Sequence, residues 1–364
     1  MKICICGGGN LGHVIAGFTA ARGFEVNVLT SQPERWHKSI TVKRPDHWLP
    51  LIGQLSCVSS RPEEVVAGAD IVLLCLPGYA IRNTLLKIKD YLRQGYVNGT
   101  AVGSVVSSTG FFFQAMEVLP PKVPLFGLQR VPFIARTLEY GHVARLMGYK
   151  DSLRLAVENA GAGGKEVLRQ TMERMFRTPT CLMDNFYEVS LSNSNPLLHP
   201  ARLYDLWSNW QEGQVYARVP LFYEEWTEQA AQLYLDMDNE LQRLLDVLPV
   251  RKGSIPSVLK YYESTDVPSL TRKLRSIEAF KGIPAPMKET AGGYVPDFQS
   301  RYFTEDFPYG LAIVQRLAHE KGVSTPVIDC VCQWRETLPN LPEGKPLQTS
   351  PKGRDFSRFG GIEG

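Results

Sequence analysis

The chain has 364 residues, of which 44% are hydrophobic and 21% are charged, a composition typical of a globular protein long enough for two domains. Its 40 basic and 37 acidic residues give a formal net charge of +3, and no block of like charge indicates a partner that is a nucleic acid or an anionic membrane. The seven cysteines do not have the spacing of metal ligands, so no metal site is predicted. The sequence shows no signal segment and no long apolar run, which predicts a cytoplasmic protein without a membrane span.

The chain opens with a predicted strand at 2–6, a turn that reads GGGNLG at 7–12, a helix to about residue 22, and a strand at 25–30. A glycine-rich turn between a strand and a helix is the context that a dinucleotide-binding fingerprint requires. We expect the glycines to permit the tight turn, the approach of a pyrophosphate and the contact of helix with strand. The helix that follows would direct its N-terminus at the phosphates.

Three further apolar runs at 69–77, 99–107 and 123–133 are predicted strands, and 79–92 is a predicted helix between the first two. Continuous apolar strands indicate a sheet that is covered on both faces. The fold class is therefore α/β, with a doubly wound Rossmann domain over residues 1–180. Ligands bind such a sheet at the carboxyl ends of its strands, where Leu76 and Pro77 lie.

The choice of cofactor depends on the end of the second strand, where an acid would bind the ribose hydroxyl of NAD. This chain has Thr30 and Ser31 there, followed by Arg35, a pattern that favours the 2′-phosphate of NADP. Arg35 is also consistent with an ordinary solvated arginine on a helix. The residues expected to contact the cofactor are Gly7, Gly9, Asn10, Leu11, Gly12, Thr30, Arg35, Leu76 and Pro77.

From about residue 151 the pattern becomes amphipathic and helical, with clear stretches at 165–176 and 228–248. A helical second domain over residues 181–364 is predicted, and amphipathic helices of this kind serve either a core or a homodimer interface. The chain is thus expected to be a monomer or a homodimer.

His199 lies in the segment NPLLHP. The residues alone favour equally a histidine that transfers protons and a histidine that only packs in the interior. The segment 292–311 supplies groups that would complete a site. Asp306 or Glu305 would orient the imidazole, and Arg301 would bind a substrate carboxylate in bidentate fashion. The acids could equally cap the helix that follows, and Asn195 could bind substrate or cap the helix at His199.

Several segments spread over nearly the whole chain resemble the opine dehydrogenases, the family of the NAD/NADP octopine and nopaline dehydrogenases. They are CICGGGN at 4–10, VLT at 28–30, ERW at 34–36, HP at 199–200, PLFYE at 220–224, FKG at 280–282 and VPDFQSRYFTEDFPYG at 295–310. The resemblance implies a Rossmann domain joined to an all-helical opine dehydrogenase domain, similar to the C-terminal domain of 6-phosphogluconate dehydrogenase.

The resemblance also implies a reaction, the reversible NAD(P)H-dependent condensation of an amino acid with a 2-oxo acid such as pyruvate. It makes His199 and Asp306 the catalytic pair and Arg301 a substrate ligand. Because octopine-forming relatives use NADH with a similar segment at 28–36, NAD is expected first and NADP remains open.

The chain departs from octopine-forming relatives near the amino-acid pocket, where Gln129 and Arg130 stand in place of an acid suited to a guanidinium. Arg130 would favour a neutral or acidic amino acid if it lines the pocket. Two other functions fit the architecture. One is a hydroxy-acid or ketopantoate-like reductase that needs no amine, and the other is a non-catalytic NAD(H) sensor.

Overall fold

A computed structural model describes residues 1–93, 95, 99–339 and 341. These residues form two compact units, the first over Met1–Ser190 and the second from Leu191 onward. Among the described residues no helix is long and apolar enough to cross a membrane.

The first unit is built on the predicted doubly wound sheet. Its eight strands, in spatial order, are β12 (Thr180–Leu182), β11 (Leu153–Glu158), β8 (Leu125–Leu128), β7 (Ala101–Ser104), β6 (Ile71–Leu74), β1 (Lys2–Cys6), β2 (Glu25–Leu29) and β5 (Cys57–Ser59). Neighbouring strands run parallel except β8 and β11. All four residues of β6, β7 and β8 are buried, as the continuous apolar runs predict for a sheet with two covered faces.

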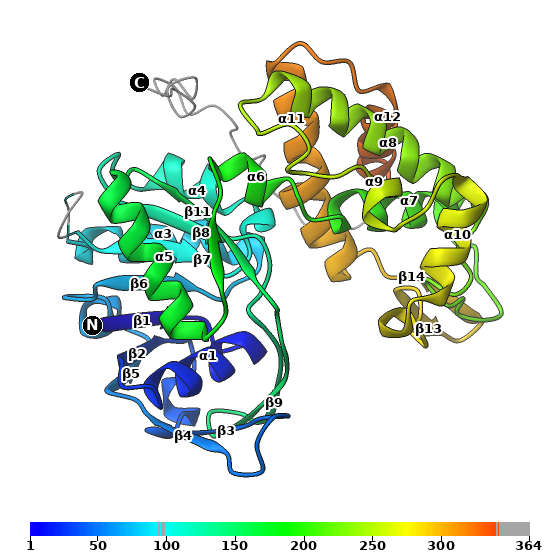
Figure 1. The fold of residues 1–364 in the computed structure, drawn as a ribbon. Coiled ribbons are helices and arrows are strands. Elements are labelled where there is room, and N and C mark those ends of the chain that lie inside the picture. Colours follow the sequence, from blue (N-terminus) through cyan, green and yellow to red (C-terminus); the bar gives the residue numbers. More distant parts are fainter. Residues whose placement is uncertain (94, 96–98, 340, 342–364) are drawn as a thin grey trace. The chain divides into compact units, whose positions relative to one another are not determined.

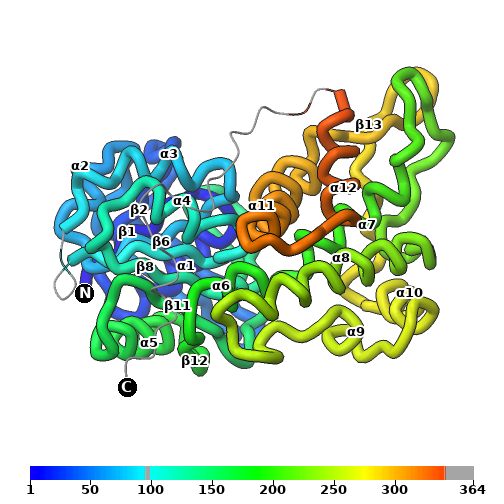
Figure 2. The backbone as a smooth tube through the Cα atoms, turned by 90° about the horizontal axis from the view of Figure 1, so that it is seen from above, coloured from blue at the N-terminus to red at the C-terminus, as the bar shows by residue number. Residues whose placement is uncertain are grey.

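Helices cover both faces of this sheet (Figure 2). On one side lie α1 (Asn10–Ala20) and α5 (Ala162–Phe176), and on the other lie α2 (Pro62–Val65), α3 (Gly78–Ile88) and α4 (Phe111–Val118). The short helix α6 (Phe186–Ser190) ends the unit. Single turns of 3₁₀-helix connect several elements: η1 (Pro33–Arg35), η2 (Lys89–Tyr91) and η3 (Ser107–Thr109) in this unit, and η4 (Glu278–Phe280) in the second.

A smaller sheet, which the sequence did not predict, packs on α1. Its strands are β4 (Leu51–Gln54), β3 (Ser39–Lys43), β10 (Val143–Tyr149) and β9 (Phe133–Glu139) in spatial order. Burial alternates along β9 and β10, so that one face of the sheet covers the helix and the other carries exposed side chains. The added sheet completes the core around α1 with residues such as Ile40, Val42 and Leu146.

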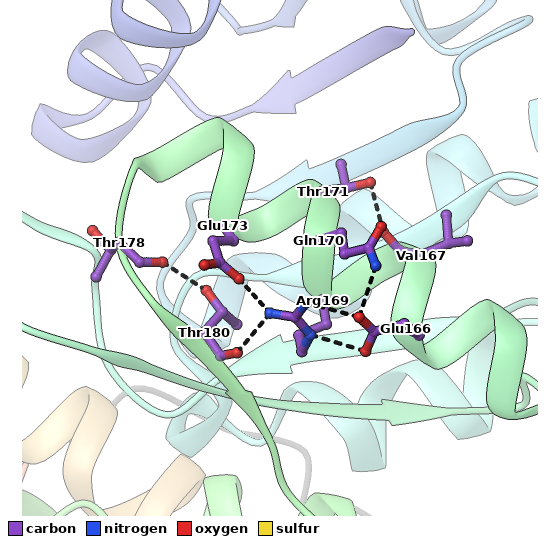
Figure 3. A network of polar contacts seen from close by, with 8 residues as sticks. All are labelled: Glu166, Val167, Arg169, Gln170, Thr171, Glu173, Thr178 and Thr180. Atoms are coloured by element: carbon purple, nitrogen blue, oxygen red, sulfur yellow. Dashed lines mark hydrogen bonds and ion pairs between the residues drawn. The ribbon is translucent and has the colours of Figure 1, made fainter.

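Arg169 ties α5 to the last strand of the large sheet (Figure 3). Its guanidinium donates to Glu166 and Glu173 on its own helix and, over 3.2 Å, to the carbonyl oxygen of Thr180 in β12. Because Arg169 presents several donors in a fixed planar fork, one side chain fixes both the helix face and the strand.

The second unit is mainly helical (Figure 1). It contains α7 (Asn195–Trp207), α8 (Glu228–Val247), α9 (Val258–Tyr261), α10 (Val267–Ser276), the π-helix η5 (Tyr302–Leu311), α11 (Ala312–Glu320) and α12 (Pro326–Glu336). It also contains a hairpin of β13 (Met287–Thr290) and β14 (Gly293–Pro296), which the expectation of an all-helical domain omitted. Helix α7 packs against both α8 and η5, and this packing brings His199 to the residues of η5.

Candidate active site

The glycine-rich turn joins β1 to α1 as predicted. Gly7 has φ +121°, a backbone conformation that side chains disfavour, and a Cβ there would lie 2.7 Å from the carbonyl oxygen of Cys75. A Cβ on Gly12 would overlap the carbonyl oxygen of Gly7. Both positions therefore require glycine, one for the turn and the other for the close contact between the turn and α1.

The N-terminus of α1 begins above an open space. Within the described residues, no atom lies within 4 Å of a Cβ built on Gly9, and Gly9 brings no side chain to cap the first N–H groups. Uncapped N–H groups at the positive end of a helix suit a pyrophosphate. Asn10 and Leu11 form the first turn, where the Asn10 side chain accepts a hydrogen bond from the Thr137 N–H over 2.8 Å. These residues fit a dinucleotide.

Thr30 and Arg35 border the same turn at the end of β2. A Cβ on Gly8 would lie 2.9 Å from the Thr30 hydroxyl. Arg35 is exposed on η1, donates to the Gln32 side chain over 2.8 Å, and lies 4.3 Å above the ring centroid of Tyr140. The arginine is thus held next to the position that distinguishes NAD from NADP.

Two other predicted groups lie at the carboxyl ends of neighbouring parallel strands. Leu76 and Pro77 follow β6, and a Cβ on Gly7 would lie 3.0 Å from Leu76 Cδ2. Gln129 and Arg130 follow β8 and are half-buried. Because β6 and β8 both flank β7 and run parallel to it, all four residues share one edge of the sheet with the glycine-rich turn.

In the second unit, His199 lies in α7 and is almost fully buried at 7% exposure. Its Nδ1 is 2.7 Å from Asp306 Oδ2, and its Nε2 is 2.8 Å from the hydroxyl of Tyr223. As a carboxylate, Asp306 only accepts hydrogen bonds, so Nδ1 carries the hydrogen and the neutral ring has its lone pair on Nε2. This is the tautomer that accepts a proton at Nε2.

Aromatic rings surround the imidazole. Tyr302 packs edge-on against it at 4.7 Å between centroids, and Phe222 does so at 5.8 Å. Burial raises the pKa of Tyr223, and the nearby Arg301 guanidinium opposes this rise. Arg301 itself is exposed beside this cluster, where a guanidinium can bind a carboxylate.

Asp306 lies in a π-helix. From the sequence, its segment could have formed either a functional site or the N-terminal cap of the helix that follows. The chain is helical without a break from Arg301 into α11, and residues 302–311 are wound as a π-helix around Pro308. A proline in an α-helix clashes with the carbonyl four residues earlier, and wider winding relieves that clash. Thr304, Glu305 and Asp306 therefore lie inside the helix, and the capping role considered for them is wrong.

Comparison with known proteins agrees with both the nucleotide-binding unit and the helical unit. Residues 182–338 match the family model "NAD/NADP octopine/nopaline dehydrogenase, alpha-helical domain", and residues 2–98 match "NADP oxidoreductase coenzyme F420-dependent". The chain is 29% identical to the opine dehydrogenase of Haliotis discus hannai, with 92% of this chain and 89% of that protein covered. It is 29% identical to the tauropine dehydrogenase of Arabella iricolor, with 92% and 91% covered.

A solved structure of octopine dehydrogenase with NADH and L-arginine has a TM-score of 0.81 and 26% identity, over 92% of this chain and 89% of that one. The chain is thus similar to opine dehydrogenases over 92% of its length, and its helical half matches their family model. It is an NAD(P)-dependent oxidoreductase of the class that acts on CH–NH groups.

The sequence does not predict two residues of the His199 cluster, Tyr223 and Arg202. Tyr223 falls within the PLFYE segment that supports the resemblance, yet nothing in the sequence pairs it with His199. Arg202 is buried, donates from Nε to the Phe222 carbonyl over 3.0 Å, and binds Asp205 over 2.7 Å. A buried arginine on the same helix as His199 thus fixes the backbone that carries Tyr223.

His13 is a second residue whose role only the structure shows. Its buried ring accepts a hydrogen bond at Nε2 from the Gly141 N–H over 2.7 Å and stacks on Trp36 at 4.1 Å. Burial lowers its pKa, which favours the neutral ring that this acceptor role requires. His13 therefore fastens the cofactor-side helix to the turn between β9 and β10.

Asn195 begins α7, one turn before His199. Its backbone N–H donates to the side chain of Asn193 over 3.1 Å, so Asn193 satisfies a donor at the helix start. This leaves the half-buried Asn195 side chain as a candidate for substrate binding rather than for capping.

Proposed function

We propose that this protein catalyses the reversible reductive condensation of an L-amino acid with a 2-oxo acid of the pyruvate type, through an imine. The observation that carries the proposal is the buried His199–Asp306 pair, with Nδ1 bonded to the carboxylate over 2.7 Å. Reduction of an imine requires a group that gives and takes a proton near neutral pH, and an oriented imidazole does this.

The roles of the residues follow from their chemistry. His199 takes a proton from the amine nitrogen as water leaves and the imine forms, and it returns one as the C=N bond is reduced, while Asp306 orients the ring and stabilises its charged form. Arg301 binds the carboxylate of the oxo acid, and Asn195 hydrogen-bonds a substrate polar group. The nicotinamide cofactor, when bound, supplies the hydride.

Binding of the cofactor is assigned to the glycine-rich turn and its neighbours in the first unit: Gly7, Gly9, Asn10, Leu11, Gly12, Thr30, Arg35, Leu76 and Pro77. We place NAD first, because the octopine dehydrogenase structure at 26% identity contains NADH. NADP is the second choice, since Arg35 follows the end of β2, where an arginine can bind a 2′-phosphate.

Gln129 and Arg130 are proposed to select the amino acid. A cation in that pocket favours neutral or acidic side chains and disfavours arginine. Arg130→Glu is then expected to move the preference toward basic amino acids, and an unchanged preference would contradict this assignment. The neutral variant Arg130→Gln separates loss of the cation from gain of an acid.

We place the reaction in the cytoplasm, since all seven cysteines are free thiols and a reducing compartment keeps them so. The physiological unit is proposed to be a monomer or a homodimer.

The deciding experiment measures oxidation of NADH and of NADPH in separate wells with pyruvate and each common amino acid, beside wells without amine. Oxidation that requires both substrates supports the proposal. Oxidation that proceeds equally without amine indicates a hydroxy-acid reductase, and cofactor binding without turnover indicates a sensor.

Two histidine variants provide a matched control. His199→Ala should lose turnover and retain NADH binding. His319→Ala should retain both, because the exposed side chain of His319 pairs with Asp329 and not with the Asp306 that bonds His199.

A further inference from the structure

The second ring nitrogen of His199 is already engaged. Nδ1 is bonded to Asp306 and Nε2 to the Tyr223 hydroxyl over 2.8 Å, so an imidazole with two nitrogens has both occupied. The nitrogen that must exchange protons with substrate is thus the one that Tyr223 covers.

Tyr223 is held in this position from several sides. Its ring stacks on Phe280 at 4.0 Å, and its side chain is only 5% exposed. The backbone on its N-terminal side is fixed by two bonds, one from the Phe222 N–H to the Ile283 carbonyl over 2.7 Å and one from buried Arg202 to the Phe222 carbonyl. Movement of the phenol away from Nε2 would require this whole segment to rearrange.

A phenol is suited to pass a proton at this point. A tyrosine hydroxyl both donates and accepts, so it donates to Nε2 of the neutral ring and accepts from Nε2 of the charged ring. The charged or titratable groups that face it are His199, Asp306, Tyr302, Tyr262 and Arg301. Burial raises the pKa of Tyr223, which keeps the phenol protonated and able to donate.

We propose that Tyr223 is the outer member of a proton relay, Tyr223–His199–Asp306, through which substrate exchanges protons with the imidazole. As the substrate nitrogen gives its proton to Tyr223 Oη, the Oη–H proton moves to His199 Nε2, and the same steps run in reverse when a proton returns. No electrons are transferred, and the phenol is neutral before and after. This inference rests on the proposed function, because that function supplies the substrate proton.

The test compares the wild type, Tyr223→Phe and Tyr204→Phe in the assay with amino acid, pyruvate and reduced cofactor. The relay predicts that Tyr223→Phe lowers kcat by about 100-fold with KM values nearly unchanged, since proton transfer by a positioned group contributes at least that factor. Tyr204 lies on the same helix as His199 and contacts Cys330 and Trp334, so Tyr204→Phe should match the wild type. A kcat for Tyr223→Phe close to that of the wild type would overturn the relay.

Replacement of Tyr223 by 3-fluorotyrosine keeps the ring and the hydroxyl and lowers only the pKa of the phenol, which makes the test independent of folding defects in Tyr223→Phe. The relay predicts that the pH optimum of kcat moves to lower pH, whereas an unchanged pH profile shows a merely structural tyrosine and overturns the relay. A wild type without amine-dependent turnover contradicts the proposed function itself, so the two failures are distinguishable.

Discussion

His199 and Asp306 are 107 residues apart in the sequence, yet His199 Nδ1 lies 2.7 Å from Asp306 Oδ2. The contact exists because α7 packs on the π-helix η5, which carries the carboxylate to the histidine.

Asp306→Asn should lower kcat by about 100-fold or more. An amide can donate to Nδ1 and so favour the wrong tautomer of His199, and it cannot stabilise the charged ring. Steady-state kinetics with saturating substrates measures this. Asp329→Asn is the matched control, because Asp329 bonds His319 in the other histidine–aspartate pair described in this unit. Equal loss in both variants would mean that the effect is general damage.

Gly12→Ala should weaken NADH binding about 10-fold or more, because the added Cβ would overlap the Gly7 carbonyl and push α1 away from the turn. Titration of NADH fluorescence measures the dissociation constant. Gly163→Ala is the control. It lies in α5 with no atom within 4 Å of the built Cβ among the described residues, so it should leave binding unchanged and stabilise the helix by up to about 1 kcal/mol.

Glu158 should make the first unit less stable as the pH rises. Burial raises its pKa from 4.5 to about 7, although its carboxylate accepts a bond from the Phe186 N–H over 2.9 Å. A carboxyl group whose pKa is higher in the folded state than in the unfolded state stabilises the fold at low pH. This stabilisation is complete below the unfolded-state pKa and is lost as the pH rises through the folded-state pKa. The loss between pH 4.5 and about 7 is on the order of 3 kcal/mol.

Glu158→Gln removes this titration and keeps an oxygen for the Phe186 N–H. Urea unfolding of both proteins at about pH 5 and about pH 8 should show the variant gaining on the wild type at the higher pH. A difference between the proteins that stays constant over this range would show that the carboxyl does not titrate there.

Arg202→Met should destabilise the second unit by about 3 kcal/mol, because it leaves Asp205 and the Phe222 carbonyl without their buried partner. It should also lower kcat, since the Phe222 backbone positions Tyr223. Thermal or urea unfolding measures the first effect. The exposed Arg218 binds Glu225 and serves as the control, and Arg218→Met should leave the stability nearly unchanged because an exposed ion pair contributes little.

The doubly wound sheet of the nucleotide half could be predicted from the sequence because its signals are local. A strand, a glycine-rich turn and a helix follow one another within 20 residues, and β6, β7 and β8 are continuous apolar runs. The small sheet was missed because β3 and β10 pair across about 100 residues of chain, and short alternating strands give little signal alone.

The pairing of His199 with Asp306 could be predicted through the family resemblance, but the arrangement around it could not. The π-helix replaces a predicted cap because Pro308 reads as a helix boundary in sequence. In the sequence, Tyr223 is one residue of an aromatic segment and Arg202 is one residue of a helix. Only the tertiary packing brings them close to His199. Such contacts depend on tertiary structure and leave no periodic pattern.

The proposed imine reduction is tested most directly by a reaction with reduced cofactor deuterated at the transferable C4 position, pyruvate and the preferred amino acid, followed by mass spectrometry of the product. The proposed reaction gives one condensed product in which the amino-acid nitrogen is bonded to the former keto carbon and that carbon carries the deuterium. Deuterium found instead in a hydroxy acid that lacks the amine would contradict it.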